Sequence, residues 1–229
     1  MQIEILAQPT NTVAKITFEA GEEITAEGGS MVAMSAGLSV ETSTHKRGKR
    51  GIGRAIKRAF AGENFFLNHY QAAAAGTTLY IGPPLSGDIM SHDLNGNSLI
   101  VQGYSFLAHE ASVDMDMSWQ GFKNLLSSEG LFWLKMSGQG KVLINTFGAI
   151  YPVEVDGEYI VDTGHIVAFD EGLKFKLSKV GKSWTGSFLG GEGIVCRFSG
   201  KGTVWCQSHS PANLGNALGR LLKPIEVQE

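Results

Sequence analysis

Short stretches in which apolar and polar residues alternate recur along most of this chain. The clearest is LKFKL at residues 173–177, where two lysines separate three apolar residues. A period of two places the lysines on one face of a β-strand and the apolar side chains on the other. Other stretches are rich in β-branched or aromatic residues and are bounded by Gly, Asp, Asn or Ser. The strands predicted in this way lie at residues 13–18, 99–107, 142–145, 159–161, 173–177 and 193–206.

Two glycine-containing tetrapeptides, SGQG at 137–140 and SGKG at 199–202, separate apolar stretches. Glycine adopts a positive φ without strain, so both are predicted as hairpin turns. Strands at this density with turn signals indicate a β-sandwich or barrel.

Two sequence elements recur three times in alternating order. The first reads GSMVAMSAGL, GYSFLAHEAS and GHIVAFDEGL, beginning at residues 29, 103 and 164. The second reads FAGENFF, LSSEGLF and LGGEGIV, and its glutamates recur at intervals of 66 and 63 residues. Self-similarity at a fixed period is typical of repeat architectures. The sequence therefore predicts one mainly β domain of three diverged copies, at approximately 1–90, 91–152 and 153–229, packed with pseudo-threefold symmetry.

A few short helices are expected beside these strands. Near the C-terminus, Ser210 is a suitable N-cap, Pro211 suits the first turn, and the leucines and alanines that follow form one apolar stripe before Lys223 and Pro224. Two shorter candidates lie at residues 52–60 and 119–126. The C-terminal helix is predicted to be amphipathic.

Positive charge is concentrated in one place. The chain has 19 basic and 22 acidic residues. Seven of the basic residues and no acid lie at residues 46–58, which we call the basic segment. The rest of the chain then has 12 basic against 22 acidic residues. The basic residues of this segment are Lys46, Arg47, Lys49, Arg50, Arg54, Lys57 and Arg58.

The basic segment has two interpretations. Clustered Lys and Arg side chains bind the phosphates of nucleic acid or an anionic membrane surface. Alternatively, the segment is a solvated loop that leads into a helix docked by its apolar side. GKRGIG lacks the order of a phosphate-binding loop, GxxxxGK[ST].

The repeated glutamates are a second candidate site. Around a pseudo-threefold axis, Glu63, Glu129 and Glu192 would occupy equivalent places, where converging carboxylates could hold a hard cation or a small ligand. In the structural alternative, each glutamate accepts backbone hydrogen bonds where a strand begins. The six histidines show no close ligand spacing. We therefore predict no metal site, no cofactor and no catalytic residues.

Cysteine use and the start of the chain bear on location. Cys196 and Cys206 are the only cysteines, which argues against a disulfide framework. A bond across the predicted SGKG hairpin and a pair of reduced, half-buried thiols are both open. The start MQIEILAQP lacks a basic end followed by an apolar stretch, and no apolar run approaches the roughly 18 residues of a membrane span. We expect a cytoplasmic protein.

Three stretches carry a family resemblance: AEGGSMVAMSAGLSVET at 26–42, RAFAGENFFLNHY at 58–70 and GGEGIVCRFSGKGTVWCQSHS at 190–210. They resemble a bacterial family of uncharacterised proteins related to the altered-inheritance-of-mitochondria proteins, over nearly the whole chain. The resemblance implies a fold similar to the tryptophan RNA-binding attenuator protein, whose subunits are small β-sandwich units. It transfers no RNA- or tryptophan-binding residues. The segment KRGKRGIGRAIKR is more basic than this family's usual glycine-rich sequence there.

Two functional hypotheses follow. The first is a non-enzymatic binding or scaffold protein that contacts an anionic or protein partner through its basic segment. The second is a small-ligand-binding protein or enzyme with a site where the three copies meet. Self-association through the C-terminal helix stays open.

Overall fold

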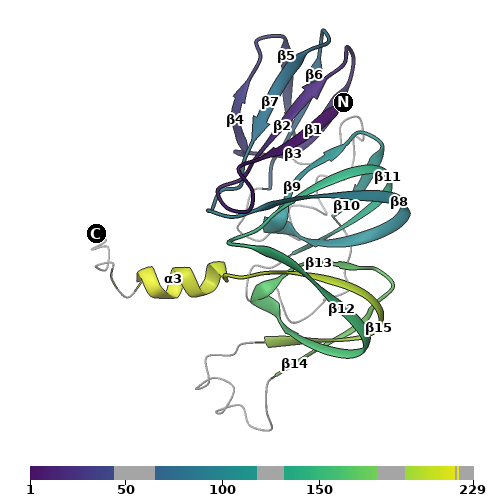
Figure 1. The fold of residues 1–229 in the computed structure, drawn as a ribbon, viewed down its shortest axis with the longest axis vertical. Helices are drawn as coiled ribbons and strands as arrows, with labels where there is room; N and C mark the ends of the chain where they lie inside the picture. The colour runs from purple at the N-terminus through teal and green to yellow at the C-terminus, as the bar shows by residue number, and fades with distance from the viewer. Residues whose placement is uncertain (44–64, 118–131, 180–193, 220, 222–229) are drawn as a thin grey trace, which may run out of the picture.

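The described part of the chain is mainly β, as predicted, and it has one short α-helix near the C-terminus (Figure 1). The computed structural model describes residues 1–43, 65–117, 132–179, 194–219 and 221. The strands are β1 Gln2–Leu6, β2 Val13–Phe18, β3 Glu23–Glu27, β4 Met31–Met34, β5 Leu38–Ser43, β6 Leu67–Ala72, β7 Thr77–Ile81, β8 Ile89–Gln102, β9 Phe106–Glu110, β10 Val113–Asp116, β11 Trp133–Asn145, β12 Ile150–Asp162, β13 Ile166–Asp170, β14 Lys174–Lys179 and β15 Ile194–Gln207. The helix α3 is Pro211–Gly219, and two 3-10 helices are η1 Gly103–Ser105 and η2 Thr163–His165.

The strands form three groups that follow one another along the longest axis of the molecule (Figure 1). The first group is β1–β7, the second is β8–β11 and the third is β12–β15. One sheet has the order β1-β2-β7-β4, and the other has the order β12-β15-β13-β8-β11-β9-β3-β6-β5. The larger sheet therefore runs through all three groups.

Alternating patterns produce the buried faces of these strands. In β2, Ala14, Ile16 and Phe18 are fully buried, while the residues between them are partly exposed. In β14, the side chains of Lys174 and Lys176 are exposed and those between and after them are partly buried, which confirms the predicted alternation. The buried side chains form three core clusters, one centred on each group, and each cluster also takes in residues of a neighbouring group.

The predicted SGQG and SGKG hairpin turns are wrong, because both tetrapeptides lie inside long strands, β11 and β15. Gly138 and Gly140 adopt φ of 119° and 146°. A β-carbon on Gly138 would lie 2.6 Å from the carbonyl oxygen of Ser112, in the tight connection between β9 and β10. The glycines therefore let the long strand bend closely around that connection. The neighbouring strand β8 pairs with β11 on both sides of a register shift between Ser137 and Gln139. β11 therefore continues through its glycines without turning back.

One pairing pattern occurs in all three groups. β4, β9 and β13 pair with β7, β11 and β15, and each ladder has a register irregularity at the matching place. In each ladder, a side chain at the end of the short strand, or just after it, accepts a hydrogen bond from a backbone N–H of the partner strand. The bonds run to Ser35 Oγ from Thr78 N (2.9 Å), to Glu110 Oε2 from Lys141 N (3.0 Å) and to Asp170 Oδ2 from Thr203 N (2.8 Å).

Two of these short strands also join neighbouring groups. At the first junction, β9 pairs with β3, with Thr25 opposite His109. At the second junction, β13 pairs with β8, with Ile100 opposite Phe169. Both ladders are antiparallel and three residue pairs long. The groups are therefore connected by continuous hydrogen-bonded sheet.

The predicted C-terminal helix is confirmed as α3, which follows Ser210 and has no buried residues. The N–H of Leu214 donates to the carbonyl oxygen of Ser210, as expected at a helix start. Cys196 and Cys206 are both free and buried, and they lie on one strand, β15. The helices predicted at 52–60 and 119–126 lie outside the described residues.

Candidate functional site

Both sites predicted from the sequence lie in parts of the chain outside the described residues. These are the basic segment, with Lys46, Arg47, Lys49, Arg50, Arg54, Lys57 and Arg58, and the repeated glutamates Glu63, Glu129 and Glu192. The contact surface and the small-ligand site suggested for them stay predictions.

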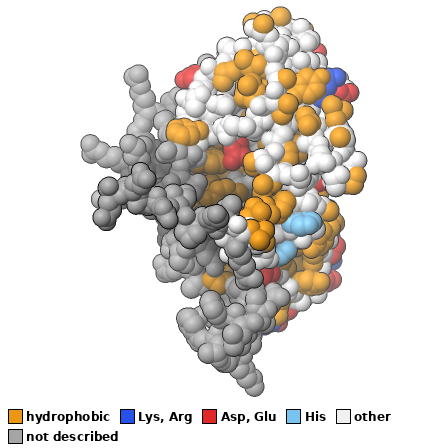
Figure 2. Space-filling model, turned by 90° about the vertical axis from the view of Figure 1, so that its left-hand side faces the viewer, with side chains coloured by type: hydrophobic (Ala, Val, Ile, Leu, Met, Phe, Trp, Pro, Cys, Tyr) orange, Lys and Arg blue, Asp and Glu red, His pale blue; other side chains and the backbone are white. Residues whose placement is uncertain are grey.

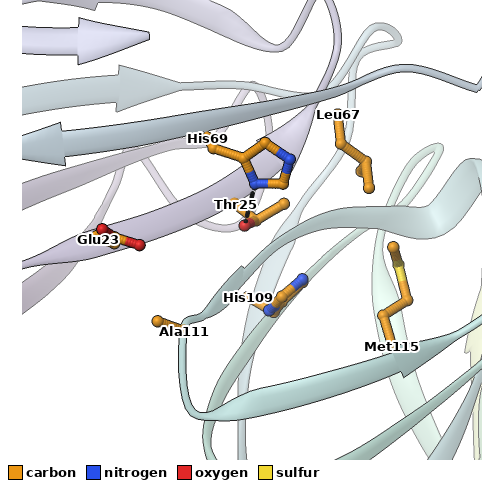
Figure 3. A pocket seen from close by; sticks show the side chains of 7 residues that line it. All are labelled: Glu23, Thr25, Leu67, His69, His109, Ala111 and Met115. Carbon is orange, nitrogen blue, oxygen red and sulfur yellow. Dashed lines mark hydrogen bonds between the residues drawn. The ribbon is translucent and has the colours of Figure 1, made fainter. Parts of the chain in front are cut away.

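A different site occurs at the first junction, where a hollow of about 290 Å³ lies between the first and second groups (Figure 3). Strands β3 and β6 form one wall, and β9, β10 and their connection form the other. Glu23 and Ala111 lie toward one end, and Leu67 and Met115 lie toward the other. The lining residues are Glu23, Thr25, Leu67, His69, His109, Ala111 and Met115.

His69 is held in this wall by hydrogen bonds at both ring nitrogens. Its Nδ1 lies 2.9 Å from the hydroxyl oxygen of Thr25, and its Nε2 lies 2.7 Å from that of Ser43. A neutral imidazole has one donor and one acceptor nitrogen, so one hydroxyl donates to the ring and the other accepts from it. His69 is therefore oriented by its neighbours and is not free to act as a metal ligand.

His109 occupies the opposite wall. Its Nδ1 lies 2.8 Å from the carbonyl oxygen of Glu110, an arrangement in which the ring donates its proton to the backbone. The sheet register sets His69, Thr25 and His109 side by side on three neighbouring strands. All three side chains are more than nine-tenths buried. The hollow is thus lined by polar groups that are fixed by hydrogen bonds.

The second junction has the same strand arrangement with different side chains. Phe169 takes the register position of His109. Trp133 and Phe175 take the register positions of Leu67 and Met115, two of the apolar residues that line the hollow. The ring centroid of Phe169 lies 5.6 Å from that of Trp133 and 5.5 Å from that of Phe175. Lys135 Nζ also forms an ion pair of 2.7 Å with Glu171 Oε1, joining the second and third groups. Aromatic packing and an ion pair therefore occur at the second junction where polar groups line the hollow at the first.

Burial perturbs the pKa of several titratable groups, among them one carboxyl and both thiols. Burial raises the pKa of the Glu27 carboxyl, at the end of β3, to about 7. It also raises the pKa of the Cys196 thiol to about 12 and that of Cys206 to about 11. Both thiols are therefore protonated near neutral pH and are poor nucleophiles. The described residues contain no group of three His, Cys, Asp or Glu arranged to hold a metal ion.

Sequence reasoning did not single out Thr25, His69 or His109. His69 lies 44 residues from the threonine that it bonds, and no motif links the two. The only local signal is the first sequence element itself, whose second copy contains His109. The pairing of β3 with both β6 and β9 is what places these side chains together.

A family model described as Mitochondrial biogenesis AIM24 matches residues 3–209, which include all the described strands except the first residue of β1. The chain belongs to this family. The predicted resemblance is therefore confirmed, while a fold similar to the tryptophan RNA-binding attenuator protein stays a prediction.

Similar chains occur in Streptococcus pyogenes. An uncharacterized protein of Streptococcus pyogenes serotype M6 is 27% identical over 217 residues, covering 92% of this chain and 86% of that one. A crystal structure of a Streptococcus pyogenes protein superposes with a TM-score of 0.79 at 26% identity, covering 96% of this chain and 99% of that one. No helix within the described ranges is long and apolar enough to cross a membrane.

Proposed function

We propose that this AIM24-family protein is a non-enzymatic scaffold built from three copies of one β unit, at approximately 1–90, 91–152 and 153–229. The observation that supports this most directly is the shared register of β4·β7, β9·β11 and β13·β15, with its irregularity at the matching place each time. Pseudo-threefold symmetry stays a prediction, because β4 and β12 would have to meet to close such an arrangement and they end different sheets.

The roles of the described polar side chains favour a scaffold over an enzyme. Glu110 and Asp170 accept backbone N–H groups at the recurring position. The imidazole of His69 is bonded to hydroxyls at both nitrogens, and the two thiols are buried. A nucleophile or general base needs a reactive atom directed at a substrate. These groups hold strands in place instead.

We further propose that the basic segment contacts an anionic partner. Its seven positive charges contrast with the net negative charge of the remaining chain, so an anion would be attracted to one place. Because such binding releases counterions or meets charged headgroups, it should weaken as salt rises.

The test neutralises Lys46, Arg47, Lys49 and Arg50 together with glutamine. Binding to vesicles that contain an anionic lipid and to single-stranded RNA is measured at low and high salt. The matched control neutralises four basic residues on the described sheet of the third group: Lys174, Lys176, Arg197 and Lys201. Loss of salt-sensitive binding in the first variant alone supports the proposal. Equal binding by both variants and the parent protein contradicts it.

The hollow at the first junction favours a second candidate, a small-ligand-binding protein or enzyme. A hollow of about 290 Å³ with mixed polar and apolar walls is at the lower limit of the size of small-molecule sites. The double substitution Thr25→Ile and His109→Phe places in the hollow the residue types of Ile100 and Phe169, which take these positions at the second junction. Native mass spectrometry of the purified protein should then show a bound mass that this variant lacks. An unchanged mass in both proteins, equal to that of the bare chain, contradicts this candidate.

A further inference from the structure

The two ends of the row of strand groups each present a strand with one free edge. Within the described part of the chain, β4 pairs only with β7, and β12 pairs only with β15. In the middle of the molecule, the strands with the corresponding registers are paired on both sides. Unpaired edges are ready templates for pairing with another chain.

The edge of β4 corresponds to the edges that form the two junctions. Ala33 lies opposite Tyr80 in β7, as Ala108 lies opposite Leu143 and Ala168 lies opposite Trp205. The far edges of β9 and β13 pair with β3 and β8, respectively. The far edge of β4 has the same strand geometry and no described partner strand.

The edge of β12 corresponds to the other side of those junctions. In β8, Val101 and Ile100 lie opposite Leu134 and Lys135 of β11, and their free edge receives β13. In β12, Val161 and Ile160 lie opposite Cys196 and Arg197 of β15 in the matching register. No described strand follows at that edge.

Burial differs between the junctions and the two ends. All residues at 106–109 in β9 and 166–169 in β13 are buried, whereas all four residues of β4 are exposed. Val32 exposes 62% of its surface, Met31 44% and Met34 41%. Hydrophobic side chains are visible across the upper part of the molecule in Figure 2, on the side where Figure 1 places β4.

The end at β12 is similarly apolar and exposed. Tyr159 and Ile160 each expose 47%, although the residues at the matching places in β3 and β8 are buried. Val40 of β5, which takes the register position of Phe175, is also exposed at the β4 end. At both ends, apolar side chains are therefore exposed at register positions that are buried in the two junctions.

We propose that a second copy of this chain docks its β4 against β12, forming a third junction of the same kind. The register of the two existing junctions places Met34 of one copy opposite Ile160 of the other, and Ala33 opposite Val161. Because the two surfaces differ, the contact is head-to-tail and leads to a ring or an open chain of copies. This inference rests on the proposed three-copy scaffold but does not require the basic segment.

A second copy fits these edges better than an unrelated peptide. The chain already makes this antiparallel contact twice, with the same length and register. Both edges carry apolar side chains that complement one another, and β4 contains no charged residue. Burial of these side chains should make the association insensitive to salt, unlike the proposed anion binding.

A mixing experiment tests the head-to-tail contact. Met34→Lys blocks the β4 edge, and Ile160→Lys blocks the β12 edge. Size-exclusion chromatography with light scattering should show oligomers of the parent protein and monomers of each variant alone. An equimolar mixture of the two variants should form a dimer and nothing larger, because one free edge of each kind remains.

Tyr151→Lys is the matched control, since it lies on β12 with a similar exposure of 45% but outside the junction register. It should associate like the parent protein, and circular dichroism should show that all three variants fold. A monomeric parent protein, unimpaired association of either blocked variant, or a mixture that stays monomeric would each overturn the proposal.

A disulfide test checks the register. Directly opposite residues of antiparallel strands have β-carbons about 4.5–5.5 Å apart, close enough for a disulfide after a small shift. Oxidising a mixture of Met34→Cys and Ile160→Cys chains should yield a linked heterodimer on a non-reducing gel. Met34→Cys mixed with Tyr151→Cys should not. Equal cross-linking in both mixtures would rule out the proposed register. Loss of anion binding in the basic-segment variant should leave this cross-link unchanged.

Discussion

The first and second junctions share a backbone arrangement and differ in what fills it. Both join neighbouring groups through a three-residue antiparallel ladder. At the second, Phe169 packs between Trp133 and Phe175, whereas at the first His109 faces a hollow of about 290 Å³. The backbone ladder therefore sets how the groups are joined, while side chains decide whether the contact is solid or open. Stability should be concentrated at the second junction and adaptability at the first.

Removing the aromatic side chain of Phe169 should have the largest effect. Phe169→Ala creates a cavity among buried rings and should lower the free energy of unfolding by about 3–5 kcal/mol. His109→Ala enlarges an existing hollow and should cost about 1–2 kcal/mol. Urea unfolding of both variants measures the difference. Equal losses would show that the two junctions are equally well packed.

Glu27 should make the first junction sensitive to pH, because it ends β3 where the uncharged Gln102 ends β8. Its pKa is about 7 in the folded protein against an ordinary value of 4.5, so the folded state binds the proton more tightly. Stability should therefore fall as pH rises from 4.5 to about 7, by up to about 3 kcal/mol.

Glu27→Gln should remove that part of the pH dependence and leave a protein that is more stable than the parent at pH values above about 7. Urea unfolding at a series of pH values compares the two proteins. The same slope in both would show that this carboxyl is not the responsible group.

The recurring side-chain acceptor should matter at both junctions. Asp170→Ala leaves the partly buried backbone N–H of Thr203 without its acceptor. The free energy of unfolding should fall by about 2 kcal/mol. Asp170→Asn keeps an acceptor oxygen and should recover part of the loss. Glu110→Ala and Glu110→Gln form the matched pair at the first junction. Thermal unfolding in which asparagine and alanine are equally harmful would contradict an acceptor role.

The ion pair at the second junction should have the smallest effect. The side chains of Lys135 and Glu171 are 30% and 40% exposed, so water and salt weaken their attraction. A double-mutant cycle with Lys135→Met and Glu171→Gln should give a coupling below about 1 kcal/mol that falls as salt rises. A larger, salt-independent coupling would mean that the ion pair is a principal contact of this junction.

Strand positions were predictable wherever alternation was regular. The stretch at 13–18 coincides with β2, and the alternating lysines at 174 and 176 lie on the exposed face of β14. The predicted hairpins failed because a glycine that adopts positive φ also suits a bend within a strand. Whether a strand turns back or bends depends on its partner, and β8 and β12 are long enough to follow β11 and β15 through the bend.

The candidate site was not predictable from local sequence. Alternation shows that Thr25 and His69 point to one face of their strands, but not which strands are neighbours. His69 and His109 come together only because β3 pairs with both β6 and β9. The basic segment was conspicuous in the sequence for the opposite reason, since its charges lie within 13 neighbouring residues.

The sequence by itself determined the β class, most of the strand faces, the C-terminal helix and the family, because these depend on periodicity and on local motifs. The tertiary structure decided which strands meet, and so where the polar hollow, the aromatic junction and the exposed edges of β4 and β12 lie. Long-range pairing selects one register among many that the same local pattern allows. Identical ladders with different side chains are therefore visible only once the strands are in place.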